Sequence, residues 1–376
     1  MYGMIKFEDW EVRKETKYSK LSYYYKNEKV DKLNLKNNIN KKDLINAQAL
    51  FESDKIDFAQ FQFSHIIEIQ IPENIEIIND SAFNSCADLV KVQIPESVID
   101  IGLSAFAHCK KLTDINIPNN ITVIKAGTFA GCQSLTSIHI PESVTCIHGE
   151  LFVHGAFQGC TGLIEVKIPK NVTSIGDYAF ANCRKLEKIN IPEGVTCIID
   201  SAFENCIRLT NISIPEAVTI MGNYVFNGCD KLEQINIPKN IRNIGIGFLQ
   251  DCINLKSITI PQSVINIENC AFNNCKSLTE ITIPKNVKDI RNYAFNGCTG
   301  LKEIKWESLM KPTKEKLDKV FTYCNNIKKF NYNGKEINLC SEKSEASLDQ
   351  IISNNKIPKT KTSDLIIDDF KENLEK

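Results

Sequence analysis

Apolar and polar positions recur along this chain with a period of 23 residues. Between residues 66 and 306 the repeating unit has the form L-x-x-I-x-I-P-x-x-V-x-x-I-x-x-x-A-F-x-x-C-x-x, as in LEKINIPEGVTCIIDSAFENC. About eight positions in each unit are apolar, which is too few for one unit to fold alone. The period therefore predicts a solenoid in which each turn is stabilised by its neighbours.

Cysteine and proline keep the same period. Prolines recur from Pro72 to Pro284, and cysteines are spaced by 23 residues except for one gap of 28. The repeating cysteines are Cys86, Cys109, Cys132, Cys160, Cys183, Cys206, Cys229, Cys252, Cys275 and Cys298. Stacked turns would place them in one buried column, where each fills space as a small apolar side chain.

Each unit predicts three short elements. Ile-x-Ile alternates with period two, as a strand does when one face is buried, and proline ends that strand because it has no N–H to donate. A second extended piece carries the Val and Ile that lie three apart. A short helical turn such as DYAFANC follows, and Gly or Asn before Cys can end it in the left-handed conformation. The expected fold is a mainly β repeat solenoid with short helical turns and a parallel sheet on its concave face.

The residue between the two Ile columns should point outward on that concave face. These positions form a polar ladder of Gln93, Asn116, His139, Lys167, Asn190, Ser213, Asn236, Thr259 and Thr282. Such a ladder could bind a peptide, a protein edge or a glycan through hydrogen bonds. It lacks the Trp and Tyr anchors of a tight interface, and it could equally serve only to keep a wide sheet soluble.

The motif I-x-I-P-x-x-V-x-x-I-x-x-x-A-F-x-x-C-x-x-L resembles that of the BspA-like (Treponema-type) leucine-rich repeat family over roughly residues 66 to 306. The resemblance implies an arc-shaped solenoid, and it implies surface proteins or adhesins that bind host or partner proteins. This chain shows no signal peptide or membrane span, so we expect a cytoplasmic location, with surface exposure as the alternative that the family implies.

Several segments depart from the repeat. We expect an N-terminal cap or small accessory region over 1–65, a C-terminal cap over 307–340 and a flexible polar tail over 341–376. Five extra residues near 148–155 predict a loop whose tip, Leu151, Phe152 and Val153, is a candidate contact, or else a locally longer turn. The tail sequence SDLIIDDFKENLEK could form an amphipathic helix that docks on a partner or packs back onto the cap.

Composition excludes several classes of function. With 45 Lys and Arg against 46 Asp and Glu, no field strong enough to attract nucleic acid is expected. His139, His148 and His154 lie near Cys146 and Cys160, but their spacing is not that of a chelating pair, so we expect no metal and no cofactor. No nucleotide-binding or hydrolase motif occurs. The sequence therefore predicts a monomeric, non-catalytic module that binds a protein partner.

Overall fold

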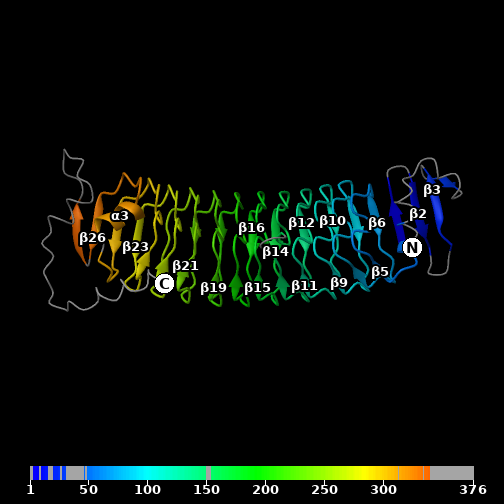
Figure 1. Cartoon of the computed structure of the whole chain (residues 1–376), viewed down its shortest axis with the longest axis horizontal. Coiled ribbons are helices and arrows are strands. Elements are labelled where there is room, and N and C mark those ends of the chain that lie inside the picture. The colour runs from blue at the N-terminus through cyan, green and yellow to red at the C-terminus, as the bar shows by residue number, and fades with distance from the viewer. Residues whose placement is uncertain are drawn as a thin grey trace, which may run out of the picture.

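The computed structural model describes residues 3–7, 10–15, 20–25, 28–30, 46, 49–149, 154–311, 313–332 and 334–338. Its turns stack in chain order into an elongated solenoid of about twelve turns, with the N-terminal strands at one end and β26 at the other (Figure 1). The predicted repeat solenoid with parallel sheets is confirmed.

The first strand of each turn carries the polar ladder. In chain order this series is β6 (Glu68–Gln70), β8 (Lys91–Gln93), β10 (Asp114–Ile115), β12 (Ser137–His139), β14 (Glu165–Lys167), β16 (Lys188–Asn190), β18 (Asn211–Ile212), β20 (Gln234–Ile235), β23 (Glu280–Ile283), β25 (Glu303–Trp306) and β26 (Lys329–Tyr332). Where neighbours pair, they do so in parallel, 23 or 28 residues apart as in Lys167↔Asn190 and His139↔Lys167, or 26 residues apart between β25 and β26. Equivalent positions of successive turns therefore lie side by side, about 4.8 Å apart.

The second strands form a parallel stack of their own. They are β5 (Lys55–Ile56), β7 (Ile77–Ile78), β9 (Asp100–Ile101), β11 (Val123–Ile124), β13 (Cys146–Ile147), β15 (Ser174–Ile175), β17 (Cys197–Ile198), β19 (Ile220–Met221), β21 (Asn243–Ile244), β22 (Asn266–Ile267) and β24 (Asp289–Ile290). Five of them, β11 to β19, make one continuous sheet.

The third side of each turn differs from the expected short helical turn. In DYAFANC, Tyr178 and Asn182 have positive φ angles of 53° and 59°, which a right-handed helix does not allow. The N–H groups of Phe180 and Asn182 instead donate to the carbonyls of Ala202 and Glu204 in the next turn, at 2.8 and 2.7 Å. Consecutive β-turns replace the helix because their N–H groups can then donate hydrogen bonds to carbonyls in the next repeat of the solenoid.

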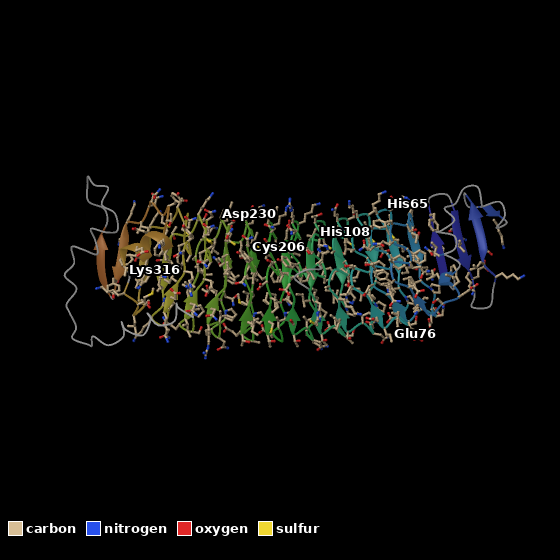
Figure 2. All side chains as sticks on the ribbon, in the orientation of Figure 1. His65, Glu76, His108, Cys206, Asp230 and Lys316 are labelled. Atoms are coloured by element: carbon tan, nitrogen blue, oxygen red, sulfur yellow. The ribbon has the colours of Figure 1, made fainter. Side chains whose placement is uncertain are left out.

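The core is a line of side chains that runs the length of the solenoid. Phe203 lies parallel to Phe180 and Phe226, with ring centroids 5.6 and 5.5 Å apart. One turn interrupts this stack, because Leu249 takes the Phe position and Phe248 takes the Ala position, where it meets Phe226 edge-on at 86°. Figure 2 shows Cys206 within the body and His65 and Glu76 at opposite edges.

Both ends continue the sheet of first strands. An antiparallel series of β1 (Gly3–Lys6), β2 (Trp10–Lys14), β3 (Ser22–Tyr25) and β4 (Glu28–Val30) joins it where β1 pairs with β6. At the other end the helix α3 (Lys314–Val320) precedes β26, and β26 pairs antiparallel with β27 (Lys335–Asn338). Trp306 and Phe330 are buried there, with ring centroids 6.3 Å apart.

Candidate binding surface

The polar ladder lies on the outer face of the first-strand series. Each of its residues stands between two buried apolar side chains, as Asn190 does between Ile189 and Ile191. Eight of the nine ladder residues are exposed and Thr282 is half-buried. Strand alternation explains this arrangement, because neighbouring side chains point to opposite faces.

Two ladder residues bond to the protein itself. Asn236 accepts a hydrogen bond from the N–H of Ile214 at 2.9 Å and donates to its carbonyl at 2.7 Å. Asn116 does the same with Ile94, at 2.8 and 2.6 Å. In both cases the side-chain amide takes the place of the backbone N–H and C=O groups that would otherwise pair with the adjacent turn. Asn116 and Asn236 therefore have a structural role, which the sequence pattern did not reveal.

Backbone pairing along the ladder face is interrupted between β10 and β12, between β16 and β18, and after β20. Within the described residues, no backbone hydrogen bond joins 187–190 to 210–213. Ile189 and Ile212, on either side of this gap, are 9% and 6% exposed, against 1% for Val166 in a continuous part. The turns are therefore more loosely joined at these points.

Hollows lie over two of these interruptions. One of 530 Å³ is lined by Lys167, Lys188, Asn190 and Asn211, among others. The next, of 440 Å³, is lined by residues that include Ser213, Asn236 and Thr259. The middle of the ladder thus has hollows as well as exposed hydrogen-bond donors and acceptors. A flat polar sheet has the donors and acceptors but no hollows.

Charges beside the ladder neutralise one another between turns. Lys91 pairs with Asp114 at 3.4 Å, and Lys305 pairs with Glu280 at 3.0 Å. The hydrogen bond to Glu280 raises the pKa of Lys305, so this amine stays charged. Exposed pairs of this kind contribute little stability. Their effect here is to leave the face with a weak net field, so recognition on it would depend on hydrogen bonds.

The tip of the insertion, Leu151, Phe152 and Val153, lies outside the described residues. At its C-terminal end His154 meets His108 edge-on, with ring centroids 5.9 Å apart. Burial lowers the pKa of His108, and the positive charges of His154 and Lys110 lower it further. The insertion therefore ends against the repeat that contains His108. This contact lies on the side of the solenoid formed by the β-turns, not on the face that carries the ladder.

The histidines near the insertion do not converge on a metal. Of the described residues, no three His, Cys, Asp or Glu side chains are grouped closely enough to hold an ion, and this includes His139, His148 and His154. Cys160 is fully buried in the core, so it is not available to them.

The cysteine column has a hydrogen-bonding role besides filling space. Each thiol donates to the carbonyl of a core residue in the preceding turn, as Cys206 does to Phe180 at 3.3 Å. Ten of these contacts use a Phe carbonyl, and Cys275 uses Leu249. The described cysteines are all free thiols. Burial raises the pKa of Cys160 to about 12 and that of Cys206 well above its usual value, so both stay protonated.

Across the part of the chain that the structure describes, no helix has the length and apolar character needed to cross a bilayer.

The comparisons with known proteins agree on the repeat. A family model described as BspA type leucine rich repeat region (6 copies) matches residues 54–154, 153–264 and 247–363. No curated protein sequence matches the chain significantly.

Among solved structures, a leucine-rich repeat protein from Bacteroides ovatus is 29% identical, covers 71% of each chain and has a TM-score of 0.62. The leucine rich repeat protein of T. pallidum is 34% identical over 44% of this chain and 78% of its own, with a TM-score of 0.41. The first of these proteins, with its TM-score above 0.5, shares the solenoid fold of this chain.

Proposed function

The chain belongs to the BspA-type leucine-rich repeat family, and from that premise we propose that it is a non-catalytic interaction module whose polar ladder binds a protein partner. The observation that carries this proposal is the coincidence of exposed polar residues, broken backbone pairing and two hollows in the middle of the ladder, from β14 to residue 259. Lys167, Asn190 and Ser213 are the ladder residues we propose as central contacts.

Rigid spacing supports this assignment. Neighbouring ladder residues are held by backbone pairing on both sides of each gap, so little conformational entropy is lost when a partner binds. Donors and acceptors spaced by about 4.8 Å match the spacing between neighbouring strands of a partner's sheet. A partner with an extended polar edge fits this spacing better than a compact ligand does.

The side-chain chemistry supports a role without catalysis. In the described part of the chain, histidine side chains bond to Asp88 and to Gln158, at 2.9 and 3.0 Å, and neither pair includes a Ser, Thr or Cys that the histidine could activate. The buried thiols stay protonated and are hydrogen-bonded to carbonyls, whereas a nucleophilic cysteine needs an accessible thiolate.

A pair of matched substitutions tests the ladder. Asn190 and Thr219 are both exposed, but Asn190 lies on the first-strand face and Thr219 on the second-strand face. Asn190→Lys should remove the bound protein from material purified with the intact chain, because the longer cation crosses the 530 Å³ hollow. Thr219→Lys should leave the same protein bound. Equal binding by both variants, measured by quantitative mass spectrometry, would place the contact elsewhere.

For location we propose the cytoplasm, and the alternative is a surface adhesin that binds a host protein or glycan. Protease treatment of intact cells separates the two. A cytoplasmic protein is degraded only after the cells are lysed. Degradation in intact cells would favour the adhesin, and the same ladder substitutions could then be tested on host ligands.

A further inference from the structure

A third hollow lies away from the ladder, at the corner where the first strand turns into the second. Its volume is 720 Å³, and its lining includes Arg242, Lys285, Lys288, Ile265, Leu309 and Met310. These residues come from four successive turns, including the last one of the repeat.

The rim of this hollow is basic. Arg242, Lys285 and Lys288 are exposed, and none of them forms an ion pair within the described residues. The column that contains Arg242 and Lys288 consists of Thr122, Thr145, Thr173, Thr196 and Thr219 in the preceding five turns. Arg242 and Lys288 thus take positions that threonine occupies in the earlier turns. The hollow is therefore basic, although the net charge of the whole chain is close to zero.

The floor of the hollow is apolar. Leu309 is 72% exposed, at the position where the previous turn has Asn286. The segment around Leu309 is held in place, because Ser308 donates to the carbonyl of Val287 at 2.6 Å and the Trp306 ring N–H donates to the carbonyl of Met310 at 3.0 Å. A large leucine side chain is therefore presented to solvent from a well-anchored backbone.

We propose that this hollow binds the chain's own acidic segment 364–370, DLIIDDF. That segment carries three carboxylates, Asp364, Asp368 and Asp369, and four apolar side chains, so it complements three cations around an apolar floor. It lies outside the described residues. Opposite charges that meet partly shielded from water attract more strongly than exposed pairs do.

The intervening chain is long enough for this contact. From Asn338, the last described residue, to Asp364 there are 26 residues, which can span about 85 Å when extended. The hollow ends within about 20 Å of the last turn along the solenoid axis, at about 4.8 Å per turn. Tethering gives an effective concentration near the millimolar range, so a weak intrinsic affinity suffices.

Zero-length carbodiimide cross-linking of the full chain tests the contact, because it joins a lysine amine only to a carboxylate that touches it. A mixture of ¹⁴N- and ¹⁵N-labelled chains distinguishes contacts within one chain from contacts between two. We expect Lys285 and Lys288 to link to Asp364, Asp368 or Asp369 of the same chain about tenfold more often than Lys167 and Lys188 do. These two control lysines line the hollow of 530 Å³.

A variant that keeps both reactive lysines provides the second measurement. Arg242→Glu combined with Leu309→Ser should lower the yield at Lys285 and Lys288 about tenfold, and Lys167→Glu should not change it. Circular dichroism shows whether each variant is folded. Equal yields at all four lysines would overturn the proposal, and so would links only between chains of different isotope, which would assign the hollow to a second copy.

Discussion

Alkaline pH should unfold this protein through its buried cysteine column. Burial raises the pKa of eight fully buried thiols: Cys109, Cys132, Cys160, Cys183, Cys206, Cys229, Cys252 and Cys275. In the unfolded chain the same thiols ionise near their ordinary pKa of 9.0. When folding raises the pKa of a group, the free energy of unfolding is unaffected by that group below the unfolded pKa. Above the unfolded pKa, the free energy of unfolding decreases as the pH rises, because the unfolded chain ionises first.

The magnitude follows from the unfolded pKa alone. At pH 10 each unfolded thiol gains roughly 1–2 kcal/mol by releasing a proton that the folded thiol must keep. Eight thiols together lower the free energy of unfolding by on the order of 10 kcal/mol, which is comparable to the whole stability of an ordinary domain. We therefore expect folding to be lost between about pH 9 and pH 10.5 in the presence of a reductant.

Urea unfolding followed by circular dichroism at a series of pH values measures this loss. We compare midpoints, because long repeat arrays need not unfold in two states. The matched control is the triple variant Cys183→Ser, Cys206→Ser and Cys229→Ser, whose hydroxyls can donate to the same carbonyls but do not ionise. Its midpoint should fall less steeply with pH, by about three eighths. Lysine and tyrosine ionise equally in both proteins, so identical slopes would refute the role of the thiols.

Three further predictions concern stability at neutral pH. Phe203→Ala opens a void between two stacked rings and should cost about 3–5 kcal/mol in urea unfolding, and a loss under 1 kcal/mol would mean that the Phe column is not tightly packed. Asn236→Ala should lower the free energy of unfolding by about 1–2 kcal/mol, because it removes two hydrogen bonds to Ile214. Asn190→Ala should lower it by less than about 0.5 kcal/mol. Equal losses would contradict the structural role of Asn236. Ile5→Ala should cost about 2–5 kcal/mol, since Ile5 is fully buried in β1 opposite Ile69, and a loss of hydrogen-exchange protection confined to β1–β4 would identify the unit that opens.

The sequence was sufficient to predict which side chains face inward. Period-two alternation around Asn190 and the fixed spacing of Phe203 and Cys206 determine the inner and outer faces, because the same choice is repeated in every turn. The structure agrees at these positions, where Phe203 and Cys206 are fully buried and Asn190 is exposed.

Other features depend on contacts between turns, which a pattern within one turn does not contain. DYAFANC has the composition of a capped helical turn, but the N–H groups of Phe180 and Asn182 find acceptors in the next turn, and this favours β-turns. Asn190 and Asn236 occupy the same position of the repeat, yet only Asn236 bonds to the backbone of its neighbour. The hollow at Arg242 is likewise formed by four turns together.

Comparing the same position in successive turns distinguishes residues that stabilise the fold from residues that are free to bind a partner. At the buried positions nearly every turn has the same residue, so a change there, such as Leu249 in the Phe column, alters packing. At the ladder the residues differ from turn to turn while the backbone around them stays the same, so each side chain can change without cost to the fold unless it bonds across turns as Asn236 does. Binding specificity is therefore best sought at ladder positions that vary and bond to nothing, and Asn190, over the hollow at the β16–β18 gap, meets both conditions.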